Sequence, residues 1–195
     1  MQNDANQRNT YQAILDSATA LVERRGYHAF SYADVSEQVG IRKASIHYYF
    51  PNKNDLVCSV IAQYRATLRE AAARWQHLDA LQQFQGLIDF YSNEVDKPPR
   101  MCLCALLGAE MPTLPDDVRA EVQGFYQDQE RSLSQLLESG CRDGVLHVAE
   151  PFNVVAQVIR AGLEGAMISS RVYNDRARFR TIAEGLIRPY RIQPE

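Results

Sequence analysis

Residues 31–56 read SYADVSEQVGIRKASIHYYFPNKNDL, and this stretch decides how the chain is interpreted. Ser31 has a side chain suited to cap a short helix, and Gly40 is suited to end that helix. A second short helix is expected at about 43–49, with Ile46 turned toward the protein interior. Two short helices around a glycine-containing turn are the helix-turn-helix pattern, although a generic pair of this kind occurs in many proteins.

The second of these helices carries the residue types that a DNA-reading helix needs. Such a helix presents short polar and basic side chains to base edges, while an apolar residue keeps it docked on the protein. The segment 41–53 contains basic residues and no acidic residue. The side chains expected to point outward are Arg42, Lys43, Ser45, His47 and Tyr48, and those expected to point inward are Ile46 and Phe50.

This stretch resembles the TetR family of transcriptional regulators, whose motif ends in Leu-Tyr-x-(His/Tyr)-Phe-x-x-Lys-x-x-Leu. The residues that match the family motif in this spacing are Ser31, Val35, Gly40, Ile41, Ile46, Tyr49, Phe50, Lys53 and Leu56. The preceding helix also ends in Gly26-Tyr27, with Phe30 just before the cap. The resemblance is specific over about residues 10–60 and architectural over the remainder. The form IRKASIHYYFPNK also looks like a subgroup that includes regulators of detoxifying oxidoreductases.

Three positions depart from the family pattern. Arg42 stands where a capping Ser or Thr is usual, Ser36 replaces the common Ala, and His47 replaces the common Tyr. The departures at Arg42 and His47 concern how bases are read and not which family the motif resembles.

Roles for individual residues follow from the resemblance by position. It implies major-groove and nearby phosphate contacts from Arg42, Lys43, Ser45 and His47. It implies phosphate contacts from Tyr48, Tyr49 and Lys53. The alternative is that Tyr49 and Phe50 belong to the core and that Lys53 is a solvated charge.

The rest of the chain is expected to be helical, because apolar residues recur at helical spacing and β-type alternation persists nowhere. Beyond the motif, helices are expected at about 9–25, 52–75, 78–95, 102–110, 116–139, 151–173 and 176–190. The fold class is therefore all-α with about nine helices. We expect a DNA-binding domain over 1–55 and a ligand-binding and dimerisation domain over 56–195.

The composition is that of an ordinary globular protein, with 46% apolar and 23% charged residues. Residues 1–55 hold as many basic as acidic residues, so the net charge of −3 lies beyond them. No apolar run reaches the roughly 18 residues that span a bilayer, and the first ten residues do not form a secretory signal. We expect a cytoplasmic protein whose cysteines are free thiols.

Two helices near the end of the chain suggest a homodimer. The helix at 151–173 carries Val158, Gly162, Gly165, Ala166 and Ser169, mostly small residues that let another helix approach closely. The helix at 176–190 carries an apolar stripe. Together they resemble the four-helix dimer interface of the family, and burial within one chain is the alternative. A twofold dimer implies a pseudo-palindromic DNA operator.

A pocket for a small-molecule inducer is expected among the fourth to eighth helices, as in the family. The candidate lining residues are Tyr64, Phe84, Phe90, Tyr91, Met101, Cys102, Phe125, Tyr126, Gln129 and Met167. Gln129 interrupts an apolar stripe with a polar group that needs a partner, which a ligand could provide. The alternative is that most of these residues are simply core.

Cys102 and Cys104 follow Arg100, a cation that lowers the pKa of a nearby thiol. One hypothesis is that Cys102 reacts with an electrophile or oxidant and so triggers DNA release. The simpler interpretation is that both cysteines are small core residues. Their spacing relative to Cys141 and His147 does not suit a metal site, and no cofactor is expected.

An enzyme is the first competing interpretation, but the four histidines are scattered and no nucleophile, phosphate-loop or dinucleotide motif is present. An all-helical small-molecule-binding or interaction module without DNA binding is the second. We expect instead a regulator, by family analogy a repressor, in which ligand binding favours a conformer whose fourth helix has swung.

Overall fold

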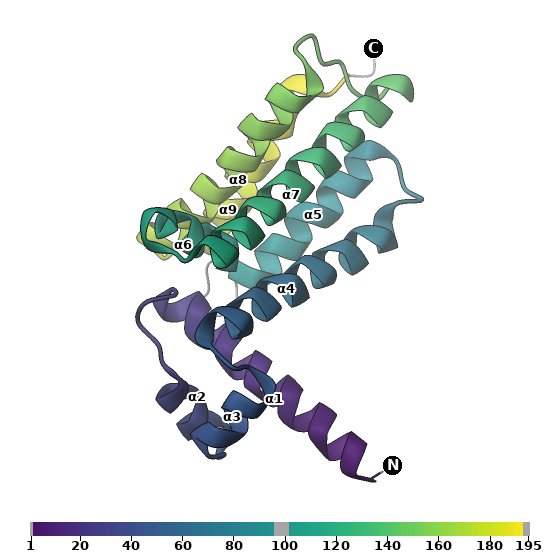
Figure 1. Cartoon of the computed structure of the whole chain (residues 1–195). Coiled ribbons are helices and arrows are strands. Elements are labelled where there is room, and N and C mark those ends of the chain that lie inside the picture. The colour runs from purple at the N-terminus through teal and green to yellow at the C-terminus, as the bar shows by residue number, and fades with distance from the viewer. Residues whose placement is uncertain (1, 96–101, 193–195) are drawn as a thin grey trace. The chain divides into compact units, whose positions relative to one another are not determined.

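The computed structural model of the chain describes residues 2–95 and 102–192. These residues form nine α-helices and two short 3-10 helices (Figure 1), so the expected all-α class is confirmed. The helices are α1 (Gln2–Arg25), α2 (Tyr32–Val39), α3 (Lys43–Tyr49), α4 (Lys53–Trp75), α5 (Ala80–Val95), α6 (Leu103–Ala109), η1 (Met111–Thr113), α7 (Asp116–Arg142), α8 (Phe152–Tyr173), α9 (Arg176–Ile187) and η2 (Arg188–Tyr190).

The chain divides into two compact units that do not follow a linear cut. Unit 1 combines residues 1–65 with 103–123, and unit 2 combines 66–102 with 124–195. Unit 1 therefore contains α1–α3, the first half of α4, α6 and the beginning of α7. The assignment of 1–55 and 56–195 as domains with separate functions stays a prediction.

The core of unit 1 is built on one face of α1. Ile14, Ala18 and Leu21 recur at three- and four-residue spacing, and each is at most 1% exposed. Gly26 ends this helix in the left-handed conformation, with φ of 75°. Its amide donates to the carbonyl oxygen of Val22 at 2.8 Å. A residue with a β-carbon is strained at such a φ, so a glycine is favoured here.

In unit 2, α5, α8 and α9 pack together (Figure 1). Asp175 caps α9 by accepting a hydrogen bond from the amide of Ala177 at 3.1 Å. Gly162 of α8 lies against Leu186 of α9, where an added β-carbon would come within 2.5 Å of the leucine side chain. The absence of a side chain at residue 162 thus allows the close approach of these two helices.

The expected helix boundaries differ from the observed ones at both ends of the chain. The first helix begins at Gln2 and not near residue 9, and α7 continues to Arg142. The last helix ends at Ile187 and is followed by η2, which contains Pro189. Proline lacks an amide hydrogen and cannot continue the α-helical hydrogen bonding. None of the helices in the described ranges is long and apolar enough to cross a membrane.

Candidate DNA-binding surface and ligand-binding core

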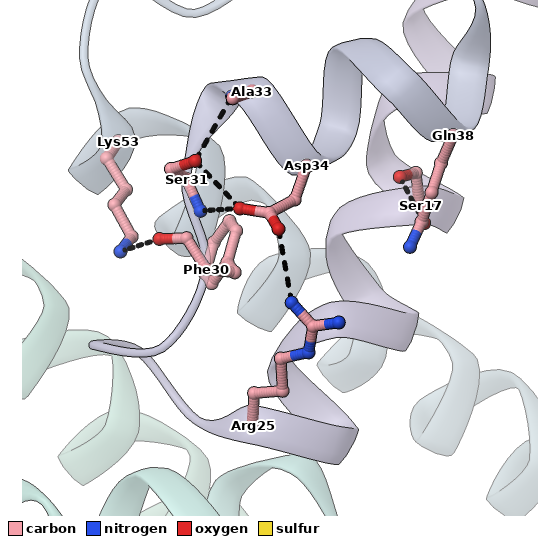
Figure 2. A network of polar contacts seen from close by, with 8 residues as sticks. All are labelled: Ser17, Arg25, Phe30, Ser31, Ala33, Asp34, Gln38 and Lys53. Atoms are coloured by element: carbon pink, nitrogen blue, oxygen red, sulfur yellow. Dashed lines mark hydrogen bonds and ion pairs between the residues drawn. The ribbon is translucent and has the colours of Figure 1, made fainter.

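The first helix of the motif is held by a capping box (Figure 2). Oγ of Ser31 accepts from the amide of Ala33 at 3.2 Å, and the Asp34 carboxylate accepts from the amide of Ser31 at 2.7 Å. Arg25, at the end of α1, donates to Asp34 at 3.1 Å. The hydrogen bonds from Ser31 and the Arg25 guanidinium lower the pKa of the Asp34 carboxyl. A local signal in the sequence therefore sets where α2 begins.

The turn between α2 and α3 is fixed by Gly40 and Ser36. Gly40 has φ of 74°, in the left-handed region that favours glycine. The amides of Gly40 and Ile41 donate to the carbonyl oxygen of Ser36 at 3.0 and 3.2 Å. The Ser36 hydroxyl donates in return to the carbonyl oxygen of Ile41 at 2.5 Å. The serine that replaces the common alanine thus adds a hydrogen bond that braces the turn.

Helix α3 is anchored by two apolar side chains, as its sequence predicts. Ile46 is 0% exposed, and Phe50, which directly follows the helix, is 2% exposed. The ring of Phe50 stacks on Tyr11 of α1 with 5.0 Å between centroids. The Tyr32 hydroxyl donates to the carbonyl oxygen of Phe50 at 2.9 Å, and burial raises the pKa of that hydroxyl to about 12. The orientation of α3 on unit 1 is therefore strongly constrained.

His47 is exposed, but its ring is held at a defined orientation. Nδ1 lies 3.1 Å from the carbonyl oxygen of Pro51, and the ring meets Tyr32 edge-on at 4.8 Å. A carbonyl oxygen only accepts, so Nδ1 carries the hydrogen in this contact. In the neutral ring Nε2 is then left as a hydrogen-bond acceptor.

The other side chains expected to meet DNA lie at different depths. Arg42, Lys43 and Tyr48 are exposed, and Ser45 is half-buried. None of these four side chains is fully buried in the core. Tyr49 is half-buried and packs edge-on against Tyr11. Tyr49 thus packs on α1 and stays partly at the surface, and its contact with phosphate stays a prediction.

The side chain of Lys53 does not extend freely into solvent. Its Nζ donates to the carbonyl oxygen of Phe30 at 2.6 Å (Figure 2). Nζ also lies 4.3 Å from the ring centroid of Phe30 and 4.6 Å from that of Tyr27. Burial lowers the pKa of the Lys53 amine. The interpretation as a solvated charge is therefore wrong. A phosphate contact stays a prediction, and it requires the amine either to bind phosphate while still bonded to Phe30 or to leave Phe30.

Residues far along the chain also brace the motif within unit 1. The Glu110 carboxylate accepts from the amide of Tyr27 at 2.6 Å. The Tyr27 hydroxyl donates to Asn54 at 2.6 Å, and Asn54 donates to Asp117 at 3.2 Å. The segment after α6 is thus tied to the end of α1, and the first turn of α7 is tied to the start of α4. No local sequence signal marks these contacts.

The N-terminal part of α1 and α3 border a shallow surface hollow of about 410 Å³. It is lined by Gln7, Arg8, Tyr11, Gln12 and Tyr49. Arg8 is a surface cation beside Tyr49, a residue expected to contact phosphate. Sequence reasoning did not single out Arg8 because it lies outside the motif.

The core of unit 2 contains a charged cluster that sequence reasoning missed. Arg160 of α8 is 3% exposed, and its Nη2 donates to Oε1 of Glu164 at 2.7 Å. The Tyr126 hydroxyl donates to the same oxygen at 2.5 Å. The guanidinium carbon lies 4.4 Å from the ring centroid of Tyr126 and 5.4 Å from that of Phe125.

The electrostatics of this cluster favour a charged guanidinium. Burial lowers the pKa of Arg160, but Tyr91, Cys102 and Glu164 nearby outweigh burial and raise it. Burial and the bond to Glu164 raise the pKa of Tyr126, so its hydroxyl keeps its proton. A signal for this site exists in the sequence, since Arg160 interrupts the apolar inner face of α8 with an acid four residues later.

Four of the residues expected to bind a ligand gather around Arg160: Tyr91, Cys102, Phe125 and Tyr126. Phe84 and Met167 are also buried in unit 2. Gln129 is half-buried on α7. Phe90 lines a separate shallow groove beside Trp75, Tyr64 belongs to unit 1, and Met101 lies outside the described residues.

The cysteines and potential metal ligands give no further site. Cys102 and Cys104 are 3% and 0% exposed, as core packing requires, and none of the four cysteines, all of which lie in the described ranges, forms a disulfide. Within residues 2–95 and 102–192, no three histidine, cysteine, aspartate or glutamate side chains come together as metal ligands do.

An apolar stripe runs along the outer face of α8. Its large members are exposed by 45–72% in the single chain: Val154, Val158, Ile168 and Val172. Ala161 and Gly165 fall between them on the same face and are also exposed. The opposite face of α8 packs inside unit 2, so this helix is apolar on two sides.

The predicted group of small residues on α8 is divided between these two faces. Val158 and Gly165 lie on the outer stripe. Gly162 lies against Leu186, and Ala166 is 1% exposed. For Gly162 and Ala166 the alternative of burial within one chain is therefore correct.

Comparison with known proteins identifies the family to which this architecture belongs. Residues 14–60 match the family described as "Bacterial regulatory proteins, tetR family", and residues 80–186 match "Tetracyclin repressor-like, C-terminal domain". The chain belongs to the TetR family. The matched regions include the helix-turn-helix and nearly all of α5–α9.

Relatives and solved structures of the TetR family agree with this assignment. The chain is 25% identical over 167 residues to the transcriptional regulator AcuR of Cereibacter sphaeroides, covering 83% of this chain and 76% of that protein. It is 25% identical over 128 residues to IcaR of Staphylococcus aureus, a negative transcriptional regulator of the icaADBC biofilm operon, covering 63% and 64%. A TetR-family regulator from Agrobacterium tumefaciens has a TM-score of 0.91 at 34% identity, covering 95% and 100%.

These TetR relatives are transcriptional regulators and not enzymes, so the enzyme interpretation is set aside. DNA operators, small-molecule ligands and dimers are typical of the TetR family. The subgroup of regulators of detoxifying oxidoreductases stays a prediction.

Proposed function

We propose that this TetR-family chain is a repressor that binds a pseudo-palindromic DNA operator as a homodimer. A small molecule that binds in unit 2, or reacts there, releases it. The observation that carries the proposal is the anchoring of α3. Ile46 and Phe50 hold the helix, while Arg42 and Lys43 remain exposed. The description of IcaR as a negative regulator supports repression rather than activation.

DNA is read, in this proposal, by the exposed side of α3. Arg42 or Lys43 facing guanine contributes about 1–3 kcal/mol of discrimination between bases. His47 offers Nε2 as an acceptor, which suits an amino group of adenine or cytosine in the major groove. Tyr48, Tyr49 and Lys53 contact phosphates, with Ser45 close to the bases. Phosphate contacts set the register and make affinity fall with salt.

The outer face of α8 supports the proposed dimer. An exposed apolar stripe of this length on a monomer marks an interaction surface. Residues 151–173 and 176–190 therefore form the twofold interface, and such a dimer places two copies of α3 about one helical turn of DNA apart.

The inducer acts on the core of unit 2. Binding favours a conformer in which α4 has swung, so that two copies of α3 no longer match the groove spacing. The thiol of Cys102 is a second trigger in this proposal. It lies near the Arg160 cation, and an electrophilic carbon bonds to its sulfur as the thiol proton leaves. Because its target is genomic DNA, we place the protein in the cytoplasm.

A DNA-binding titration tests the proposal. Operator sequences are selected from random DNA by the purified protein, and affinity is measured by fluorescence anisotropy at several salt concentrations. Lys43→Ala is expected to weaken binding about tenfold or more. Arg142→Ala, an exposed arginine in unit 2, serves as the control and leaves affinity unchanged. Absence of salt-sensitive binding would favour a helical ligand-binding module without a DNA role.

A further inference from the structure

The buried guanidinium of Arg160 contains a hydrogen-bond donor that has no acceptor in the described chain. Arg160 is 3% exposed, and its Nε lies below the surface without a partner. A buried donor without an acceptor is unfavourable, so native proteins rarely keep one without a reason. Glu164 approaches the same guanidinium through Oε1, which bonds to Nη2. The engagement of Arg160 by Glu164 is therefore incomplete.

Two aromatic rings of α7 determine where this donor can point. The guanidinium carbon lies 4.4 Å from the Tyr126 ring and 5.4 Å from the Phe125 ring. Aromatic faces attract a cation and disfavour its rotation away from them. The open Nε thus belongs to a guanidinium that is already positioned, which is what a binding site for a fixed ligand group requires.

We propose that Arg160 binds the carboxylate of a small organic acid, and that such an acid is the inducer of this regulator. The inference rests on the ligand-responsive function proposed above. Nε and a terminal nitrogen of a guanidinium form parallel donors that match the two oxygens of a carboxylate. The carboxylate of the acid accepts a hydrogen bond from Nε and replaces Glu164 as the acceptor for the terminal nitrogen of Arg160.

This exchange keeps the charges of the core balanced. Arg160 stays charged, so an unpaired Arg160 or a second buried anion would be costly, whereas one carboxylate replacing another is not. The Glu164 side chain is 18% exposed, compared with 4% for the Arg160 side chain. Glu164 can therefore turn toward water when a ligand displaces it. Tyr126, whose hydroxyl donates to Glu164, holds the resting arrangement.

The side chains around the Arg160 guanidinium determine which group can accompany the carboxylate in the ligand. Tyr91, Cys102 and Phe125 lie near the guanidinium and are buried, with exposures of 2%, 3% and 0%. These side chains favour an apolar or aromatic group beside the carboxylate. Amides and esters of the same acids lack the negative charge that replaces Glu164, so they bind more weakly.

The exchange predicts opposite effects for the two partners of the ion pair. Arg160→Met removes the donor and abolishes binding of the acid. Glu164→Gln removes the competing charge and tightens binding about tenfold, the difference expected between a charged and a neutral hydrogen-bond partner. Tyr126→Phe also loosens Glu164 and shifts binding in the same direction. A purely structural role for the pair predicts no tightening in either variant.

The test uses the full-length protein with sodium butyrate, hexanoate and benzoate as probes. Butyramide, hexanamide and benzamide are the neutral counterparts, and inorganic phosphate tests for a general anion effect. Binding is measured by isothermal titration calorimetry and by the concentration dependence of the melting temperature. Glu138→Gln, an exposed glutamate of α7, is the matched control for Glu164→Gln.

Acids that bind where their amides do not, with tightening in Glu164→Gln and none in Glu138→Gln, would support the proposal. Equal binding of acids and amides, or no binding of any acid to the wild type and Glu164→Gln, would overturn it. So would a response to inorganic phosphate equal to that for the acids. Because Arg160→Met can fail to fold, Glu164→Gln carries the decision.

Operator release is measured separately by anisotropy with a bound operator fragment. An acid that binds through Arg160 and lowers operator affinity supports its role as inducer, and an acid that binds without this effect overturns that role. If the chain binds no DNA at all, the proposed function fails, while calorimetry still decides the carboxylate site.

Discussion

Val158→Asp is expected to separate the two protomers of the proposed dimer. Val158 is 55% exposed in the single chain, in the outer stripe of α8. Burying a whole valine side chain contributes about 1.5–3 kcal/mol, so covering the exposed half of Val158 contributes roughly 1 kcal/mol in each protomer. Twofold symmetry applies the substitution twice, which makes the loss about 2 kcal/mol per dimer.

The introduced carboxylate adds a second cost. Burying a polar group without a partner costs at least about 1–3 kcal/mol in proteins, and the two negative charges come close across the symmetry axis. A total of about 4 kcal/mol corresponds to a dissociation constant roughly a thousandfold higher. The substitution lies on the outer face of α8, so the fold of the protomer should persist.

Sedimentation equilibrium of wild type and variant gives the dissociation constants directly, and circular dichroism checks that the helices remain. Gln135→Asp, at an exposed position on α7, introduces the same charge outside the stripe and should leave the dimer intact. A Val158→Asp protein that is helical and dimerises as tightly as the wild type would refute the assignment of this face.

Three further predictions concern unit 1. Ile46→Ala is expected to lower the free energy of unfolding by about 2–5 kcal/mol, because Ile46 is fully buried under α3; urea unfolding measures this, and a smaller loss would contradict the anchoring. Ser31→Ala removes the cap of α2 and should cost about 1 kcal/mol in the same assay, with an exposed substitution such as Glu37→Ala as the control. Burial and the neighbouring carboxylates raise the pKa of Cys58 to about 11. The alkylation rate of Cys58, followed by peptide mass spectrometry, should therefore still rise about tenfold per pH unit between pH 8 and 10. A rate that levels off by pH 9 would contradict this prediction.

The helix-turn-helix was predictable because its determinants are local. Ser31 caps α2, Gly40 takes the left-handed conformation in the turn, and Ile46 docks α3, each through contacts within a few residues or through a simple apolar pattern. The all-helical class followed in the same way from the spacing of apolar residues. Boundaries were less accurate, since α1 begins at Gln2 and α7 continues to Arg142.

The position of Lys53 shows what local reasoning leaves open. Its amine meets the carbonyl oxygen of Phe30, 23 residues earlier in the chain. The sequence offered a phosphate contact or a solvated charge, and it did not show that the amine is bonded within the protein. The phosphate contact stays a prediction. The role of Ser36 in the turn was likewise visible only as a departure from the family pattern.

The small residues of α8 show a different kind of ambiguity. A helix that is apolar on two faces gives a periodic signal that does not say which face meets its own chain. Gly162 meets Leu186 within unit 2, whereas Gly165 has open space around it. Only the packing of α9 separates the two.

By itself, the sequence determined the all-helical class, the helix-turn-helix and the family, because caps, turns and apolar spacing act over a few residues. The tertiary structure alone decided that Arg160 lies buried with an open donor beside Tyr126 and Glu164, and that Glu110 reaches Tyr27. Such contacts join residues up to 83 positions apart, and their energies depend on burial that no local pattern records.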